Sequence, residues 1–262
     1  MGCFIRTSAY LIVLNDMKNR ISVCIATYNG EKYIRQQLDS IICQLADDDE
    51  IIISDDASTD NTIEVIKSYN DKRIKLYHNK FHNYVKNFEF SLSKASGEFI
   101  FLSDQDDVWK GEKIRVMKNA LSTYDLVCSN CEVVDKELNY IMDFFNCDPT
   151  NKTGFYRNFR HNNYLGCCLA FNNFILEKIL PFPKGLISHD TWIGAVGEIF
   201  GKCGFISDKL ILYRRHGENT SKTTEGSTLN YRNRIQYRLV ILKGLLSLYL
   251  RERQRHQKFS GE

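Results

Sequence analysis

Hydrophobic and polar positions alternate in blocks along the first 125 residues, and the blocks predict strands and helices in turn. Short runs of β-branched and apolar residues, such as "ISVCIAT", predict buried strands. Apolar residues at helical spacing between them, such as Ile34, Leu38 and Ile41, predict amphipathic helices. The strands are predicted at 20–28, 50–55, 73–79 and 98–104, and the helices at 31–45, 63–69, 83–97 and 110–124.

The second half is less regular. The segment 125–135 and the segment that starts at Tyr140 predict a hairpin, and 146–163 predicts a polar loop. After this loop the pattern predicts a strand, a helix that ends before Pro181, a helix between about 189 and 201, and a strand that runs into "RRHGENTSKT".

Alternating strands and helices indicate an α/β fold, in which a mostly parallel, Rossmann-like sheet carries helices on both faces. Ligands of such sheets bind beyond the carboxyl ends of the strands. Three polar clusters follow predicted strands and should therefore meet in one crevice. They are Thr27-Tyr28-Asn29, Asp55-Asp56 and the segment from Asp104 to Asp107.

Composition narrows the picture. The 262 residues, 43% hydrophobic and 26% charged, describe a globular chain rather than a disordered one. Nine cysteines without a regular spacing indicate free thiols in a reducing compartment. No apolar run reaches the roughly 20 residues of a membrane span. Residues 1–20 are interpreted as an N-terminal extension, of which 1–16 add little to the fold.

The segment "SDQDDVW" places three carboxylates, Asp104, Asp106 and Asp107, within four residues. Such crowding requires open solvent or a counter-charge. Mg²⁺ and Mn²⁺ prefer oxygen ligands and are often held by one or two carboxylates together with substrate phosphates. A solvated acidic turn explains the same pattern. An EF-hand does not, because glycine and glutamate are missing at its sixth and twelfth loop positions.

Six segments, in order, resemble glycosyltransferase family 2 enzymes of GT-A architecture, and "SDQDDVW" with "HDTW" is most similar to the rhamnosyltransferase-like branch. The segments are "SVCIATYNGEKYIRQQLDSI", "IIISDDASTDNT", "GEFIFLSDQDDVW", "GCCLAFN", "HDTWI" and "RRHGENTSK". The resemblance implies a catalytic domain over 21–222, with a nucleotide-sugar half (21–125) and an acceptor half (126–222).

The resemblance also implies roles for individual residues. The nucleotide would be bound by Thr27, Tyr28, Asn29, Glu31, Asp55, Asp56 and Asp104, with Asp55 or Asp56 on the base. The metal, Mn²⁺ or Mg²⁺, would be bound by Asp106 and His216, and the diphosphate by Arg214 and Arg215. The sugar and acceptor pocket would include Asp107, Trp109, Gly166, Cys167, His189 and Trp192.

Asp190 is the predicted general base, since it stands where the family has the second acid of its [ED]D motif. The first position of that motif is His189 here. A base is needed to take the proton of the acceptor hydroxyl as its oxygen attacks the anomeric carbon. A capping role at the start of a helix also explains Asp190, and the two roles are compatible.

The C-terminal segment 223–262 is predicted to be a basic, amphipathic helical tail. Residues 231–258 contain eight Lys or Arg and one acidic residue, a net +7, so that the rest of the chain carries −4 of the overall +3. Such a helix can lie in a membrane interface, or pack on the catalytic domain or on a partner subunit. We favour membrane contact and expect a cytoplasmic enzyme, peripheral at the inner face of the cell membrane. Nucleic acid is not expected, because the main domain has no basic stripe.

The sequence thus predicts an inverting, metal-dependent transferase. Its donor would be a dTDP- or UDP-sugar, with L-rhamnose as the first candidate sugar, and its acceptor a growing surface polysaccharide or lipid-linked glycan. Two alternatives stay open. A nucleotidyltransferase also uses paired carboxylates and magnesium, although "ATYNGEKY" offers only one Gly and one Lys. A receiver-like domain would use the pocket around Asp55 and Asp56 without catalysis.

Overall fold

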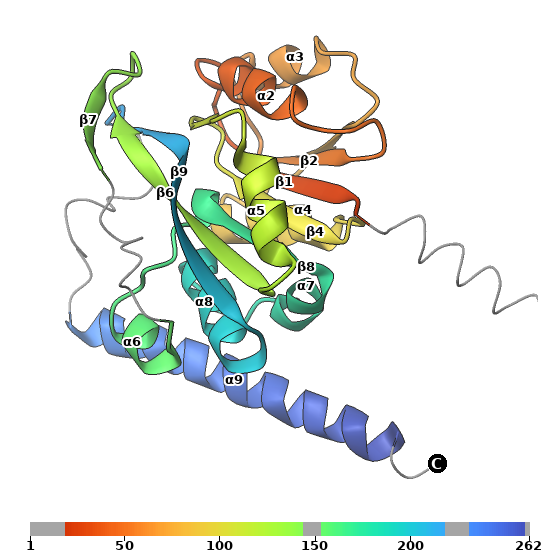
Figure 1. Ribbon diagram of the computed structural model, residues 1–262, viewed down its shortest axis with the longest axis vertical. Helices are drawn as coiled ribbons and strands as arrows, with labels where there is room; N and C mark the ends of the chain where they lie inside the picture. Colours follow the sequence, from red (N-terminus) through yellow and green to blue (C-terminus); the bar gives the residue numbers. More distant parts are fainter. Residues whose placement is uncertain (1–18, 144–152, 218–230, 260–262) are drawn as a thin grey trace, which may run out of the picture.

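A computed structural model describes residues 19–143, 153–217 and 231–259. It confirms the predicted α/β class: one mixed sheet crosses the molecule, with helices on its faces (Figure 1). The N-terminal extension up to residue 18 and the polar stretch 218–230 lie outside the described residues.

The first half forms the parallel part of the sheet. The strands lie side by side in the order β3-β2-β1-β4, and every neighbouring pair is parallel. They are β1 (Ile21–Thr27), β2 (Glu50–Asp55), β3 (Ile74–His78) and β4 (Phe99–Ser103). Four predicted helices are also present: α2 (Ile34–Ile42), α3 (Thr62–Lys67), α4 (Tyr84–Ser93) and α5 (Lys113–Leu121). Burial of both sheet faces explains why β1 and β2 read as continuous apolar runs.

The second half extends the same sheet with mixed strand directions. Strand β8 (Leu169–Asn172) is antiparallel to β4, and β6 (Leu126–Val134) is antiparallel to β8. Strand β9 (Cys203–Arg214) runs parallel to β6, and β7 (Tyr140–Asp143) completes the predicted hairpin with β6. The sheet therefore continues across position 125/126, where the nucleotide-sugar half is predicted to meet the acceptor half. The division into these two halves stays a prediction.

A two-residue strand that the sequence pattern missed fixes the acidic segment. Strand β5 (Val108–Trp109) follows Asp107 directly and pairs antiparallel with Leu212 and Ile211 of β9. A strand of two residues is too short to show a periodic pattern of apolar residues, so the sequence does not predict it. Its effect is large, because it ties the segment after β4 to the end of β9.

Shorter elements complete the acceptor half. The interpretation of 146–163 as a polar loop was wrong in part, since α6 (Phe155–Arg160) lies within it and packs against α8 (His189–Phe200). A 3₁₀ turn, η2 (Gly166–Cys168), precedes β8, and α7 (Asn173–Ile179) begins where the Asn172 side chain accepts the N–H of Ile175. Helix α8 ends at Gly201, as predicted.

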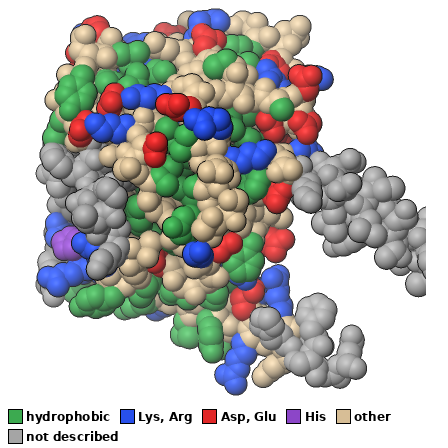
Figure 2. Space-filling model, in the orientation of Figure 1, with side chains coloured by type: hydrophobic (Ala, Val, Ile, Leu, Met, Phe, Trp, Pro, Cys, Tyr) green, Lys and Arg blue, Asp and Glu red, His purple; other side chains and the backbone are tan. Residues whose placement is uncertain are grey.

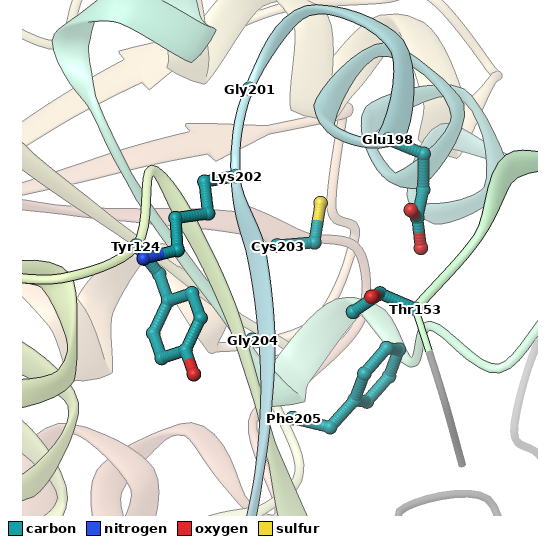
Figure 3. Close-up of a pocket in the computed structure, with 8 residues that line it drawn as sticks. All are labelled: Tyr124, Thr153, Glu198, Gly201, Lys202, Cys203, Gly204 and Phe205. Atoms are coloured by element: carbon teal, nitrogen blue, oxygen red, sulfur yellow. The ribbon is translucent and has the colours of Figure 1, made fainter.

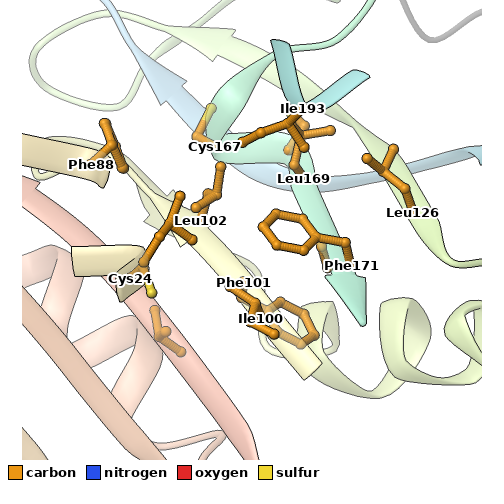
Figure 4. Close-up of a cluster of buried hydrophobic side chains, with 14 of the residues drawn as sticks. Cys24, Phe88, Ile100, Phe101, Leu102, Leu126, Cys167, Leu169, Phe171 and Ile193 are labelled. Atoms are coloured by element: carbon orange, nitrogen blue, oxygen red, sulfur yellow. The ribbon is translucent and has the colours of Figure 1, made fainter. Parts of the chain in front are cut away.

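Apolar side chains from both halves meet between β4, β8 and the helices in one core. Figure 4 shows Phe101 of β4 and Phe171 of β8 packed in this cluster, with Leu126 of β6 and Ile193 of α8 beside them. All four are fully buried. This shared core holds the ends of β4 and β9 at a fixed separation, and the functional groups lie at those ends.

The C-terminal helix α9 (Tyr231–Phe259) runs along the lower edge of the molecule, under α6 and α8 (Figure 1). Its Gly244 lies so close to Trp192 of α8 that an added Cβ would meet the indole ring at 2.9 Å. Among the described helices, none combines the length and the apolar character that crossing a membrane requires.

Candidate active site

The crowded carboxylates after β4 receive counter-charges from within the protein. Arg214, at the end of β9 and 2% exposed, donates its backbone N–H to Asp107 Oδ1 at 3.0 Å. Its guanidinium Nε donates to the backbone oxygen of Asp106 at 2.7 Å, and another of its nitrogens reaches Gln36 at 2.6 Å. Arg214 thus holds the segment 104–107 in place, so we leave it out of the set proposed to bind the diphosphate.

A second cation lies beneath the same segment. Lys113 of α5 is fully buried and donates from Nζ to the backbone oxygen of Cys167 at 2.8 Å. Its Nζ also stands 4.7 Å from the centre of the Trp109 ring. The positive charge acts to lower the pKa of Asp104, and the charge of Asp107 in turn counteracts the loss of the Lys113 proton on burial. A buried lysine without such partners would be costly.

Two cations do not neutralise the segment completely. Burial, followed by the charges of Asp106 and Asp190, raises the pKa of Asp104 to about 8. Burial, followed by the charges of Asp106 and Asp104, raises the pKa of Asp107 well above its usual range. Asp107 Oδ2 is buried and has no hydrogen-bond partner among the described residues. Asp104, Asp107 and Cys167 each offer a ligand atom, and these atoms all lie within 4.8 Å of one another. The residues therefore fit a cation.

The sulfur of this cluster is its weakest possible ligand. A hydrogen bond with Cys168, burial and the charge of Asp107 raise the pKa of the Cys167 thiol well above its usual range. A neutral thiol does not ligate a metal well, and Mg²⁺ and Mn²⁺ prefer oxygen. Oxygen from the aspartates remains as the main ligand type.

Strand β9 also brings His216 to the aspartates, 110 positions along the chain. His216 Nε2 lies 2.8 Å from Asp106 Oδ2, and the imidazole packs against the Tyr33 ring with 4.7 Å between centroids. The two residues predicted to ligate the metal are thus in direct contact. The sequence alone does not show this, because their contact depends on the pairing of β5 with β9.

Asp190, the predicted base, lies in the first turn of α8. Its Oδ1 accepts hydrogen bonds from the Ser188 hydroxyl and, at 2.7 Å, from the Thr191 N–H, while Asn162 Nδ2 lies 3.4 Å from Oδ2. Ser188, not Asp190, occupies the N-cap position. The charge of Asp190 raises the pKa of Asp104, so the two carboxylates act on one another electrostatically. That the predicted base and the acidic segment form one active site stays a prediction.

Tyr84 of α4 stands near both groups. Burial, then the charges of Asp190 and Asp104, raise the pKa of its phenol to about 12, so it stays protonated at neutral pH. Its hydroxyl donates to the backbone oxygen of Ile187, on the segment that leads into α8. A tyrosine on an amphipathic helix gives no signal of such a position in the sequence.

His189 is part of the packing around the site. It is 7% exposed, stacks on Phe88 at a centroid distance of 4.1 Å, and has a pKa lowered by burial, which favours the neutral ring. A Cβ at Gly166 would lie 2.8 Å from His189 Nε2, so the glycine is required for this close approach. Neither ring nitrogen of His189 has a partner among the described residues.

The carboxyl ends of β1 and β2 meet as predicted, and their carboxylates are already bonded. Asp55 Oδ1 accepts from Thr27 Oγ1 at 3.0 Å, and Asp55 also accepts from Ser58. Asp56 accepts three backbone N–H groups, those of residues 81, 82 and 83, at 2.5–2.9 Å. The structure gives Asp56 a role in fixing the loop between β3 and α4.

The loop after β1 is joined to the acidic segment by Gln105, which the motif analysis passed over. The Gln105 side-chain amide donates to the Tyr28 carbonyl at 3.0 Å and accepts the Tyr28 N–H at 2.8 Å. Tyr28 itself is 54% exposed. Asn29 and Glu31 are used nearby, since they accept hydrogen bonds from Thr59 and Asn61 of the loop before α3.

Both predicted pocket tryptophans are core residues. Trp109 is 3% and Trp192 is 2% exposed, and the Trp192 indole N–H donates to the Ile179 carbonyl at 2.9 Å. Trp192 faces α9, so we leave it out of the proposed pocket. Arg215, by contrast, is only partly buried, next to His216.

Two cavities lie away from the acidic segment. One, of about 460 Å³, is bordered by Tyr124, Lys202 and Phe205 near the start of β9, with Glu198 of α8 across from them (Figure 3). Glu198 already accepts from Asn158 and Tyr164, both at 2.7 Å. The other lies beside α9. The active site is therefore defined by its convergent side chains rather than by either cavity.

The mixed sheet, with its parallel first half and helices on its faces, is the fold of GT-A-like transferases. Crystal structures of S. aureus TarS share this fold. The complex with UDP-GlcNAc has a TM-score of 0.67 at 20% identity and covers 87% of this chain and 66% of its own. The mannosyltransferase PcManGT from Pyrobaculum calidifontis, in complex with GDP-Man and Mn²⁺, has a TM-score of 0.54 at 18% identity, covering 95% and 71%.

Sequence comparison gives the family. The chain belongs to glycosyltransferase family 2, whose model, "Glycosyl transferase family 2", matches residues 22–180. The dTDP-rhamnosyl transferase RfbG of Shigella flexneri is 39% identical over 74% of this chain and 72% of its own. The UDP-Glc:alpha-D-GlcNAc-diphosphoundecaprenol beta-1,3-glucosyltransferase WfgD of Escherichia coli is 30% identical over 73% and 77%. The protein is thus a glycosyltransferase, which removes the nucleotidyltransferase and receiver-like alternatives.

Proposed function

We propose that this protein is an inverting, metal-dependent glycosyltransferase that adds a sugar from a nucleoside diphosphate sugar to a hydroxyl of a growing surface polysaccharide or lipid-linked glycan. The observation that carries the proposal is the contact of His216 with Asp106 in the acidic segment 104–107, at 2.8 Å, and the charge of Asp190, which acts on the same segment by raising the pKa of Asp104, supports it. One side of the site would hold the departing diphosphate, and the other the attacking hydroxyl.

Asp190 is proposed to accept the proton of the acceptor hydroxyl. Ser188 and Thr191 donate hydrogen bonds to its Oδ1, which orients the carboxylate and leaves Oδ2 with only the long contact to Asn162. The hydroxyl oxygen, once deprotonated, attacks the anomeric carbon as the bond to the diphosphate oxygen breaks. A single displacement of this kind inverts the configuration at that carbon.

Mn²⁺ or Mg²⁺ is proposed to bind at the acidic segment, through Asp106 and His216 with Asp104 and Asp107 close by. A bound cation supplies positive charge against the charge that builds up on the leaving diphosphate. The unpartnered Asp107 Oδ2 supports this site, as does the contact of His216 with Asp106. Arg215 is proposed to face the diphosphate.

The donor nucleotide is proposed to lie across the ends of β1 and β2. Tyr28 is the exposed aromatic at this edge and can cover the base, while Asp55 is the acid that we place nearest to it. Asp104 would contact the ribose or a water ligand of the metal. The relative named as a dTDP-rhamnosyl transferase favours dTDP-L-rhamnose, and the one named with UDP-Glc makes a UDP-hexose the second choice.

The acceptor is proposed to be carried by a lipid, as the name of the Escherichia coli relative states for that enzyme. An enzyme acting on such an acceptor would work at the cytoplasmic face of the cell membrane, bound peripherally. Gly166, Cys167 and His189 lie on the acceptor side of the site and would border the sugar and acceptor.

A ligand screen tests the donor class directly. Thermal shifts are measured with dTDP, UDP and GDP, each with Mn²⁺ and with EDTA, because a ligand that binds the native state raises Tm by mass action. We expect dTDP or UDP to raise Tm only with Mn²⁺, and the Asp106→Asn variant to lose that increment. Equal shifts with and without Mn²⁺ would contradict the metal site, and absence of any nucleotide shift would contradict the donor class.

A further inference from the structure

Helix α9 leaves a continuous apolar stripe facing solvent. Six large apolar residues along it are between 40% and 59% exposed. From position 235 to 249 they advance by four or three residues, and position 250 lies four residues after 246, which keeps all six on one face of a helix. They are Ile235, Leu239, Leu242, Leu246, Tyr249 and Leu250. Scattered exposed leucines are ordinary, but an exposed stripe of this length marks an interaction surface.

The opposite face of α9 is already used. Ile241, Leu245 and Leu248 are 1%, 6% and 4% exposed and belong to the core of the protein. Tyr237 donates its hydroxyl to the Ser188 carbonyl at 3.2 Å, and Lys178 of α7 forms an ion pair with Glu252 at 2.7 Å. The helix is therefore docked on the catalytic domain, and only its outward stripe remains available.

Cations border this stripe. By helical geometry Arg238 lies along one edge of it, Lys243 along the other, and Arg253 continues it beyond Tyr249. The single acidic residue of the helix, Glu252, faces inward in its ion pair with Lys178. Figure 2 shows hydrophobic side chains together with Lys and Arg along the lower edge of the molecule, where α9 runs. The outward charge of α9 is positive.

A basic groove opens beside the stripe on its Lys243 edge. This cavity, of about 450 Å³, lies between α9 and the segment that joins α7 to α8. Lys178, Lys184, Lys243 and Arg251 contribute four cations to its lining, and Trp192 contributes an apolar wall. Within the described residues, Lys184 and Lys243 form no hydrogen bond or ion pair, so their charges are available to an anion. The groove has the size and charge to take a phosphate group.

We propose that α9 seats the protein on an anionic lipid bilayer, with the apolar stripe among the acyl chains, the bordering cations on lipid phosphates, and the basic groove around one phospholipid headgroup. An apolar face between cationic borders is the composition of helices that lie in a membrane interface. A second copy of this chain fits the stripe poorly, because pairing would bring two strongly basic helices together.

The position of α9 on the membrane also bears on the proposed sugar transfer, and this part of the inference rests on the proposed function. Tyr237 of α9 bonds to the carbonyl of Ser188, whose own hydroxyl donates to Asp190. A helix lying on the bilayer would therefore hold the proposed base close to the membrane surface. A hydroxyl on a lipid-linked acceptor could then reach the site without leaving that surface.

Vesicle co-sedimentation of the full chain, without nucleotide or acceptor, tests the docking independently of catalysis. We expect binding to vesicles of phosphatidylcholine with 30% phosphatidylglycerol, and at least tenfold weaker binding to pure phosphatidylcholine. The double variant Leu242→Gln/Leu246→Gln should bind the anionic vesicles at least tenfold more weakly. The matched control is Ile199→Gln, since Ile199 of α8 is 44% exposed but lies off the stripe, and it should bind like the unchanged protein.

The groove has its own arm of the experiment. Lys184→Gln/Lys243→Gln should weaken binding to anionic vesicles severalfold, whereas Lys67→Gln, at an exposed position of α3, should not. If the groove binds lipid headgroups, 10 mM inorganic phosphate should not raise the Tm of the protein. If it is a site for free phosphate, phosphate should raise the Tm, and the double lysine variant should lose that increase. The second result would overturn the headgroup assignment. Unchanged vesicle binding by the leucine variant overturns the membrane proposal. The membrane proposal is also overturned if light scattering shows that the protein is a dimer and that the leucine variant is a monomer with unchanged vesicle binding.

Discussion

The acidic segment 104–107 and helix α9 are the two strongly charged regions of the molecule, and they manage charge in opposite ways. The acidic segment is largely buried, Arg214 is bonded to its Asp106 and Asp107, and the buried Lys113 acts on its charge. The cations of α9 stand mostly in solvent around an apolar stripe. Charge that is enclosed is strong and sensitive to substitution, whereas exposed charge is screened by salt and acts mainly on association. The proposed catalysis would depend on charge of the first kind and the proposed docking on charge of the second.

The largest test of this contrast replaces one carboxylate of the enclosed site. Asp190→Asn keeps the shape but removes the proposed base, so transfer should fall by about 10²–10⁴-fold. Donor binding by calorimetry should stay within twofold. The matched change on α9 is Arg253→Gln, which should alter transfer to a water-soluble acceptor by less than twofold. Turnover near that of the unchanged protein in Asp190→Asn would remove this residue from the mechanism.

A buried and an exposed lysine should differ in stability. Lys113→Met removes the hydrogen bond from the buried Nζ to the Cys167 carbonyl, and leaving a buried acceptor without its donor costs about 1–3 kcal/mol of the free energy of unfolding. Lys243→Met removes an exposed charge and should change that free energy by less than about 0.5 kcal/mol. Urea denaturation followed by fluorescence measures both. If the two variants unfold at similar urea concentrations, stability is no more sensitive to replacing the buried lysine than to replacing the exposed one.

The smallest expected effect is a pH dependence of metal binding. Asp104 has a pKa of about 8 in the folded protein, raised by burial and by the neighbouring carboxylates, so it holds a proton at pH 7. The deprotonated carboxylate adds negative charge beside the proposed metal and accepts from its water ligands, so the affinity for Mn²⁺ should rise by up to about tenfold per pH unit towards pH 8 and level off above. Titration calorimetry with Mn²⁺ at pH 6.5, 7.5 and 8.5 measures this rise.

The control for that titration is Asp104→Asn, which should weaken Mn²⁺ binding and flatten its pH dependence. The same raised pKa has a consequence for stability. Below about pH 4 the carboxyl is protonated in both states, and between about pH 4 and 8 only the unfolded state ionises, so this group lowers stability as the pH rises through that window. Asp104→Asn should remove this slope in the metal-free protein.

The regular elements were predictable because their burial leaves a periodic record in the sequence. Strands β1 to β4 and the helices between them were placed within a few residues, since each buries a repeated apolar face. Two short elements were missed. Strand β5 has two residues and α6 has six, and neither carries enough of a period to be distinguished from a loop.

The motifs that carry the candidate site residues could be recognised in the sequence, but the contacts that hold these residues in place could not. The acidic segment, Asp190 and His216 were proposed from ordered motifs; His216 lies against Asp106, and the charge of Asp190 raises the pKa of Asp104. Lys113, Gln105 and Tyr84 were passed over, because a lysine, a glutamine and a tyrosine on amphipathic segments look like surface residues. Only the three-dimensional packing shows that Lys113 is buried and that Gln105 joins two loops.

The position of β9 between β6 and β5 has a practical consequence for anyone dividing this protein. The family match ends at residue 180, but the proposed base, the strand that anchors the acidic segment and the histidine beside it all come later. A fragment cut at that residue would lose β9, with which both β6 and β5 pair, together with Asp190 and His216. Any shortened version intended for assay or crystallisation should therefore retain at least the residues through Gly217.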